Sequence, residues 1–346
     1  MKFKAAVLVE SKSPFVIEEL ELQPLSVGQV LVKIDSSGVC GAQINEIDAV
    51  KGKDYFLPHL LGHEGHGEVI ECSAGTTKLT EGDKVVLHWR KGEGINSEPP
   101  KYISKNLGVI NAGWVTTFNE YAVVSENRLT VIPDYVNQDF AALMGCAVTT
   151  AYGTLTNDAK IKVGNSIAIF GCGGVGLSLI QFAKLSGCFP IIGIDIHENK
   201  LKHAESVGAT HTVNSNLKNF KKHVLEANDG LMIDVCIDNT GIPQIIEIAY
   251  SLTSPDNGRT LLVGVMDKNK KLKIWTYPLH FNQEIIGSSG GNCNPNLDIP
   301  RIIKLIDNNL LDLTDIIGKT YTLENINNAI DDLRSGDIPG RLIIRY

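Results

Sequence analysis

The sequence has no long hydrophobic run and no surplus of positive charge. Its 346 residues carry 32 Lys and Arg against 39 Asp and Glu, a formal net charge of −7. Nucleic-acid-binding domains show a basic surplus or stripe, so this balance argues against a nucleic-acid partner. No apolar stretch approaches the roughly 20 residues that a membrane-spanning helix needs, which argues against a membrane partner. The first ten residues alternate like a strand and lack the apolar core of a signal peptide, so we expect a cytoplasmic protein.

Cysteine is scarce and scattered. The chain has seven cysteines, an odd number at wide spacing, and none between residues 88 and 119. Such a pattern argues against a secreted disulfide framework and favours metal binding or buried free thiols. The hydrophobic content of 43% and the charged content of 21% are those of an ordinary globular protein. The length suggests about two domains.

The texture of the sequence changes twice along the chain. Residues 1–147 contain short alternating runs separated by Gly, Pro and Asp turns, which predicts a β-rich domain. In residues 148–287, apolar runs alternate with helical patterns, which predicts βαβ units around a parallel sheet. Residues 288–346 hold one helix and a final strand, too little for a core, so we expect this tail to rejoin the first domain. The predicted fold class is therefore α/β. The expected elements of the second and third regions are strands at 166–170, 191–195, 233–237, 260–265, 284–287 and 341–345, and helices at 175–186, 196–207 and 299–308.

A glycine-rich turn follows the first of these strands. Ile167 to Phe170 leads into Gly171-Cys172-Gly173-Gly174-Val175-Gly176, a G-x-G-x-x-G motif that opens a helix. The next strand ends at Asp195, about twenty residues on, which is the spacing of a dinucleotide-binding unit. The three motif glycines permit a tight turn, close approach of a pyrophosphate and close packing of helix on strand. Asp195 should accept hydrogen bonds from ribose hydroxyls, which favours NAD over NADP. The alternative is a Gly-rich turn beside a surface Asp.

Three residues far apart in the chain are candidate metal ligands. Cys40 follows the run 30–34 in a small-residue segment, 37–41, that we expect to be a turn; His63 lies in Gly62-His63-Glu64, and Cys146 follows Gly145. Two thiolates and an imidazole suit Zn²⁺, and three protein ligands leave a fourth position open, as in catalytic sites. Glu64 then either tunes the metal from behind His63 or exchanges with its water. Taken singly, each cysteine is as well explained as a buried apolar residue, and we read the nearby His66 as non-ligating.

Together these segments resemble the zinc-dependent medium-chain alcohol dehydrogenases over nearly the whole chain. The resemblance implies a GroES-like catalytic domain, residues 1–147 with 288–346, and a Rossmann-type NAD-binding domain, residues 148–287, with the active site between them. It also implies a homodimer or homotetramer. By position, further residues resemble coenzyme contacts of the family: Thr150, Val175, Lys200, Val265 and Arg341. The motifs that carry the resemblance are Gly38-Val39-Cys40-Gly41, Gly62-His63-Glu64 with Gly67, Glu81–Val85, Gly145-Cys146 with Thr149–Gly153, the glycine turn with Asp195 and Lys200, and Val263-Gly264-Val265.

The sequence departs from this family beside the first ligand and in one lobe. Many relatives hold a structural zinc with four close cysteines, and residues 88–119 have none, so we expect one catalytic zinc per subunit and a lobe, Lys91 to Trp114, held by packing. Ala42 and Asn45 replace the usual hydroxyl and histidine of the proton relay. The proton must then leave through a substrate hydroxyl, ordered water or His88. Gln43 stands where an Asp often orients the ligand histidine; it can still accept a hydrogen bond.

These features predict an NAD-linked zinc alcohol dehydrogenase that interconverts a small-molecule alcohol and its carbonyl. The segment His88-Trp89-Arg90-Lys91 lies where the family builds its pocket wall. If it faces the pocket, the substrate is polar, such as a polyol, a cyclitol, a sugar-like secondary alcohol or an anionic adduct. Otherwise the segment is a solvated charge run with one packing Trp. Two alternatives remain: a dehydrogenase of a hydroxymethylglutathione-type adduct, and a zinc-free carbonyl reductase or non-catalytic relative.

Overall fold

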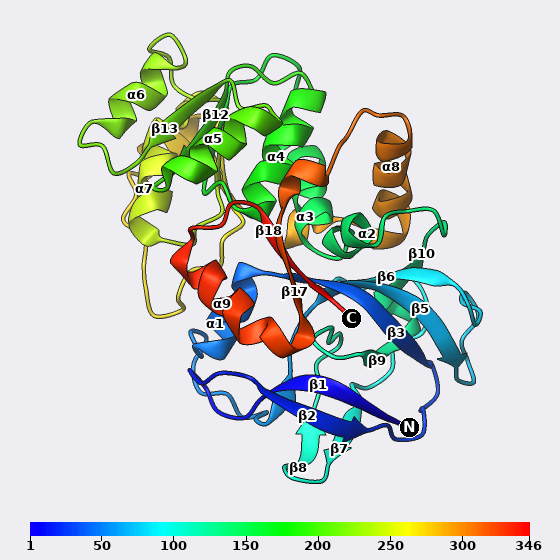
Figure 1. Ribbon diagram of the computed structural model, residues 1–346. Helices are drawn as coiled ribbons and strands as arrows, with labels where there is room; N and C mark the ends of the chain where they lie inside the picture. Colours follow the sequence, from blue (N-terminus) through cyan, green and yellow to red (C-terminus); the bar gives the residue numbers. More distant parts are fainter.

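The computed structural model describes residues 1–346 and has two halves with different sheets (Figure 1). The β-rich half has a closed barrel in the order β1-β2-β7-β8-β4, beside a second sheet in the order β10-β6-β5-β3-β18-β17 with β9 paired to β3. The barrel strands are β1 (Lys2–Leu8), β2 (Val16–Glu21), β7 (Lys101–Ser104), β8 (Gly108–Asn111) and β4 (His59–Leu60). The second sheet contains β10 (Leu129–Val131), β6 (Lys84–His88), β5 (Glu64–Cys72), β3 (Gln29–Val39), β18 (Arg341–Arg345), β17 (Ile317–Thr322) and β9 (Tyr121–Ser125).

The α/β half is built on one six-stranded parallel sheet. Its order is β13-β12-β11-β14-β15-β16, so the strand order reverses between β11 and β14. In such sheets ligands bind outside the carboxyl ends of the strands at this reversal. The strands are β11 (Ile167–Phe170), β12 (Ile191–Asp195), β13 (His211–Asn214), β14 (Val235–Asp238), β15 (Arg259–Leu262) and β16 (Glu284–Gly287).

Nine α-helices cover these sheets, and none of them is both long enough and apolar enough to span a bilayer. They are α1 (Gly41–Ile47), α2 (Gln138–Met144), α3 (Ala147–Gly153), α4 (Gly174–Leu185), α5 (Glu198–Val207), α6 (Phe220–Glu226), α7 (Pro243–Leu252), α8 (Pro295–Asp307) and α9 (Ile326–Ser335). Short 3-10 turns occur at Glu126–Arg128, Tyr277–Phe281, Gly290–Asn292, Thr314–Ile316 and Leu323–Asn325, and a wider turn follows α3 at Thr154–Ala159.

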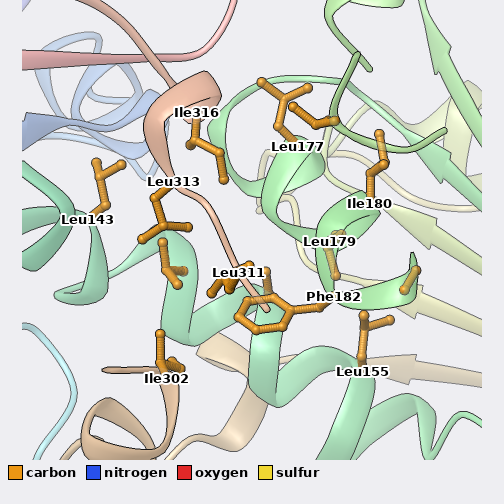
Figure 2. Packing of buried hydrophobic residues seen from close by; sticks show 14 of the residues in the cluster. Leu143, Leu155, Leu177, Leu179, Ile180, Phe182, Ile302, Leu311, Leu313 and Ile316 are labelled. Atoms are coloured by element: carbon orange, nitrogen blue, oxygen red, sulfur yellow. The ribbon is translucent and has the colours of Figure 1, made fainter. Parts of the chain in front are cut away.

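The largest hydrophobic core joins the two halves. Leu143 of α2, Phe182 of α4 and Ile302 of α8 belong to one buried cluster (Figure 2). The cluster continues through Leu313 and Ile316, in the segment that leads to β17. Because α2 ends two residues before Cys146, this core fixes the third candidate ligand to the coenzyme half.

The tail rejoins the first sheet as expected, but its helix packs elsewhere. β18 pairs antiparallel with β3, and Ile343 lies opposite Gly38. α8 instead contributes Ile302 and Ile303 to the core shared with α4. The limits 1–147 with 288–346, and 148–287, stay a prediction, since the two halves meet in a continuous core.

The turn expected at residues 37–41 is wrong. β3 continues through Ser37 and Gly38 to Val39, because this stretch pairs with β5 on one side and β18 on the other. The small residues meet a packing need instead: a Cβ on Gly38 would lie 2.3 Å from Oε1 of Glu64. Four elements were not predicted, namely β13, α7, α9 and β17, and the strand expected at 260–265 ends at Leu262.

The lobe without cysteines folds around a short hairpin. β7 and β8 pair antiparallel and close the barrel against β2 and β4. Tyr102 in β7 is fully buried, and its hydroxyl accepts a hydrogen bond of 2.9 Å from the backbone N–H of Val123. Its ring meets Phe3 edge-on, with the ring centroids 5.4 Å apart. An aromatic core therefore holds this lobe together.

Candidate metal centre and coenzyme site

The three candidate metal ligands converge from separate segments. Cys40 lies between β3 and α1, His63 just before β5, and Cys146 between α2 and α3. Their ligand atoms all lie within 4.8 Å of one another. Both cysteines are buried, and a Cys₂His set that leaves one coordination position open fits a catalytic Zn²⁺. His66 lies outside this group, and its Nδ1 is 3.3 Å from Oδ2 of Asp35.

The site favours a negative charge on the first thiol. The pKa of Cys40 lies well below its ordinary value, chiefly because the Cys146 thiol donates a hydrogen bond to it, with further help from Arg341 and His63. The same hydrogen bond, together with burial, raises the pKa of Cys146. Two buried thiols beside an imidazole and a guanidinium therefore hold one thiolate ready for a cation.

A buried ion pair supports the ligands from behind. Glu64 is 0% exposed, and its Oε1 and Oε2 accept hydrogen bonds of 2.7 and 3.0 Å from Arg341 Nε and Nη2. The backbone N–H of Ala147 donates a third hydrogen bond, of 3.1 Å, to Oε2. The pKa of Arg341 lies above its ordinary value because the negative charges of Cys40 and Glu64 outweigh burial. With both oxygens held in this way, Glu64 lies outside the group of converging ligand atoms.

Gln43 occupies the position beside the ligand histidine. Its amide nitrogen lies 2.5 Å from Nδ1 of His63, and its oxygen accepts a hydrogen bond of 2.7 Å from the backbone N–H of Gly62. Gln43 is 1% exposed, so these contacts fix its side chain. Gln43 therefore contacts the imidazole through an amide nitrogen, which is a donor, and not through the acceptor oxygen expected from the sequence, because that oxygen is held by Gly62.

A cavity of about 590 Å³ opens from His63 to the surface. Two of its lining residues are Trp89, expected in the pocket wall, and Asn45, which follows the first ligand. Three more aromatic side chains form its wall, Tyr55, Phe56 and Trp114. They could not be predicted because the loops that carry them show no periodicity. These three side chains are 80%, 70% and 42% exposed. A group of exposed aromatic side chains is typical of a binding surface.

The structure contradicts the proposed role of His88 and turns Arg90 away from the cavity. His88 is 1% exposed, and its two ring nitrogens lie 2.7 Å from the carbonyl oxygen of Arg90 and 3.0 Å from Oγ1 of Thr130. Burial lowers its pKa to about 4, so it is neutral and enclosed. Arg90 donates to the carbonyl oxygens of Cys293 and Ser289. Only Trp89 of the segment 88–91 lines the cavity.

The glycine turn has the shape that a pyrophosphate requires. Gly171 has φ +93°, and a Cβ on Gly176 would lie 2.0 Å from the carbonyl oxygen of Gly171. A Cβ on Gly173 would meet nothing within 4 Å, so a ligand can approach the backbone there. Gly174 and Val175 are the first two residues of the twelve-residue helix α4, whose N-terminus offers N–H groups to an anion. The turn therefore fits a dinucleotide.

Two of the other predicted coenzyme residues, Asp195 and Arg341, contact this turn. Asp195 ends β12, and its carboxylate accepts a 2.8 Å hydrogen bond from the N–H of Cys172 in the turn. Arg341 packs against Gly174, where a Cβ would lie 3.1 Å from its Cδ. Three more predicted contacts lie on separate elements: Thr150 in α3, Lys200 in α5, and Val265, 60% exposed, beyond the end of β15.

The fold and the two sites define a class of protein, the zinc-binding oxidoreductases with a nicotinamide dinucleotide coenzyme. Family models match in both halves: the alcohol dehydrogenase GroES-like domain over residues 26–134 and the zinc-binding dehydrogenase domain over residues 174–308. The alcohol dehydrogenase class-2 isozyme 2 of Oryctolagus cuniculus is 30% identical over 97% of this chain and 96% of its own. The chain therefore belongs to the zinc-dependent medium-chain alcohol dehydrogenase family and is an oxidoreductase that acts on alcohols.

Two further similar proteins are named for different substrates. The S-(hydroxymethyl)glutathione dehydrogenase of Synechocystis sp. is 27% identical over 97% of this chain and 98% of its own. The crystal structure of benzyl alcohol dehydrogenase from Acinetobacter calcoaceticus superposes with a TM-score of 0.90 at 26% identity, covering 100% of this chain and 99% of that one. The predicted GroES-like and Rossmann-type fold is confirmed.

Proposed function

We propose that the cavity above Cys40, His63 and Cys146 is the active site of an NAD-linked alcohol dehydrogenase. The observation that carries this proposal is the convergence of the three ligand atoms within 4.8 Å, with His63 also lining a cavity of about 590 Å³. When bound, zinc supplies a Lewis acid that lowers the pKa of the substrate hydroxyl, and NAD accepts the hydride.

The protein residues bind and orient these groups. Cys40, His63 and Cys146 would hold the metal, while Glu64 and Arg341 keep the ligand-bearing segments in register. The N-terminus of α4, from Gly173 to Gly176, would bind the pyrophosphate, and Asp195 the ribose hydroxyls, which favours NAD. Thr150, Lys200, Val265 and Arg341 complete the proposed coenzyme contacts.

We infer a substrate with a ring-shaped body and polar groups, such as a cyclitol, a sugar derivative or another secondary alcohol. The wall residues Tyr55, Phe56, Trp89 and Trp114 offer faces on which a ring can stack. The polar groups of the substrate do not meet His88 and Arg90, as the sequence suggested, because these two side chains hydrogen-bond to backbone carbonyl oxygens. The polar atoms at the cavity wall belong instead to Asn45, Glu46, Lys51, Lys53, Asp54 and His59.

The same aromatic wall admits a second candidate, a dehydrogenase of a hydroxymethylglutathione-type adduct. The lysines beside it, Lys51 and Lys53, favour that candidate, since glutathione carries carboxylates. Activity with formaldehyde only in the presence of glutathione would distinguish it. A zinc-free reductase is disfavoured, because such an enzyme has no need of two buried thiols and an imidazole within 4.8 Å. The proton path from the substrate also needs a group other than His88, so water or a substrate hydroxyl is the remaining route.

The test is a screen of alcohols and polyols with NAD and with NADP, followed through the absorbance of the reduced coenzyme. Metal analysis of the same protein gives the zinc content per chain. We expect about one zinc per chain, and loss of turnover in Cys146→Ser, with Cys236→Ser as the matched control because Cys236 is buried in the coenzyme sheet, away from the ligand group. Full turnover without zinc would refute the proposal.

A further inference from the structure

The mouth of the active-site cavity carries a group of lysines that have no carboxylate partners. Lys51 and Lys53 line the cavity on the loop that follows α1, and both are exposed. Lys268 arrives from the coenzyme half, on the loop that follows β15. Its ammonium lies over Gly52, where a Cβ would be only 2.4 Å from Lys268 Nζ. Three cations therefore meet at one opening in a chain whose formal net charge is −7.

Three carboxylates near these lysines accept hydrogen bonds from other groups, and one of them is Asp267, whose Oδ1 accepts a hydrogen bond of 2.9 Å from the backbone N–H of Asn269. Asp54 accepts hydrogen bonds of 2.8 Å from His59 Nε2 and from the backbone N–H of Phe56. Asp48 forms an ion pair of 2.7 Å with Arg334. None of the three lysines forms an ion pair, so their charge at the opening is free to attract an anion.

One more acid, Glu46, lines the cavity nearer the metal centre. Its Oε2 lies 3.4 Å from the amide nitrogen of Gln43, which in turn contacts His63. The acid is thus at the inner end and the lysines are at the outer end. Lys53 also lies 5.3 Å from the ring centroid of Tyr55, so charge and an aromatic face occur side by side at the mouth.

We propose, on the basis of the function proposed above, that the substrate is an alcohol with an anionic group, a carboxylate or a phosphate, opposite its reacting hydroxyl. The hydroxyl reaches the metal centre beside His63, the body of the molecule lies against the aromatic wall, and the anionic end meets Lys51, Lys53 and Lys268. Because the lysines are remote from the reacting atoms, they bind substrate and transition state alike. They therefore lower KM for an anionic alcohol and leave kcat unchanged.

The experiment compares three alcohols of the same shape with the zinc-loaded enzyme and NAD: benzyl alcohol, 4-(hydroxymethyl)benzoate and 4-(hydroxymethyl)phenyl phosphate. At low salt we expect kcat/KM for the anionic alcohols to exceed that for benzyl alcohol by about tenfold, and added salt to reduce the ratio. Lys51→Met, Lys53→Met and Lys268→Met should each lower the ratio about three- to five-fold through KM. Lys221→Met, an exposed position on α6, is the matched control. The larger of the two anionic ratios distinguishes a carboxylate from a phosphate ligand.

A ratio near one, or a ratio that the three substitutions leave unchanged, would overturn the proposal while the dehydrogenase activity stands. If none of the three alcohols is oxidised, the proposal is tested by binding. The affinity of each alcohol for the complex of enzyme and reduced coenzyme is then measured through the coenzyme fluorescence. Tighter binding of the anionic alcohols that depends on the lysines supports the proposal. Equal binding of all three overturns it.

Discussion

Replacing Arg341 with methionine should destabilise the protein more than any loss of a surface ion pair. The guanidinium is 4% exposed and makes two hydrogen bonds, of 2.7 and 3.0 Å, to the fully buried Glu64. In Arg341→Met the carboxylate keeps only the Ala147 N–H, at 3.1 Å. Removing one partner of a buried pair costs about 3–5 kcal/mol, because the remaining charge is uncompensated. At roughly 2 °C for each kcal/mol, the Tm should fall by roughly 6–10 °C.

The control is an exposed ion pair between β17 and α9. Lys319 on β17 bonds Asp332 at 2.9 Å, with the two side chains 52% and 34% exposed, so Lys319→Met should cost less than about 1 kcal/mol. The double variant Glu64→Gln, Arg341→Met removes both charges. The double variant should be more stable than Arg341→Met alone, because it leaves no buried charge without a partner. If the two mutations acted independently, their costs would add and the double variant would be the less stable one.

The assay is thermal unfolding at fixed zinc without coenzyme, together with zinc content after dialysis. Arg341→Met should also lose zinc more readily, because Arg341 favours the Cys40 thiolate. If Arg341→Met is no less stable than Lys319→Met, or if the double variant loses the sum of the single effects, the ion pair does not hold the site as described.

Three further predictions concern the coenzyme, the metal and pH. Asp195→Ser should raise KM for NAD about tenfold or more and narrow the preference over NADP, because a charge-assisted hydrogen bond is worth about 1.5–3 kcal/mol; unchanged coenzyme kinetics would contradict the role given to Asp195. Chelation of zinc should abolish turnover yet preserve binding of reduced coenzyme, measured by fluorescence, since the glycine turn is built on separate strands; joint loss would contradict this. Buried, neutral His88 has a pKa of about 4 against an ordinary 6.5, so the unfolded chain binds the extra proton between these values. Stability should therefore fall by about 3 kcal/mol as pH drops from 6.5 to 4. His88→Gln should flatten this slope in thermal unfolding, and the exposed-site control His211→Gln should not.

The metal ligands could be predicted from the sequence, but the buried ion pair that holds them in place could not. Cys40, His63 and Cys146 could be found because their residue types suit one metal, and the glycine turn because its spacing reports a backbone requirement. The pairing of Glu64 with Arg341 had no local signal, since 277 positions separate the two residues. His88 was misplaced because the sequence does not show which way a side chain points at the end of a buried strand. The first three residues of the expected turn, 37–39, are in strand β3 because neighbouring strands on both sides override the low strand propensity of Ser and Gly.

The insertion of β18 between β3 and β17 has a consequence for how the enzyme matures. β3 leads to the first ligand, whereas β18 brings Arg341 to the same place after nearly the whole coenzyme half has been made. During synthesis, domains fold from the N-terminus onward, so the end of β3, Ser36–Val39, has an open edge until residues 341–345 arrive. A nascent chain can therefore expose both thiols and a pairing-competent strand before the site closes. The interval between these events is when the protein is most open to taking up the wrong metal or to aggregating.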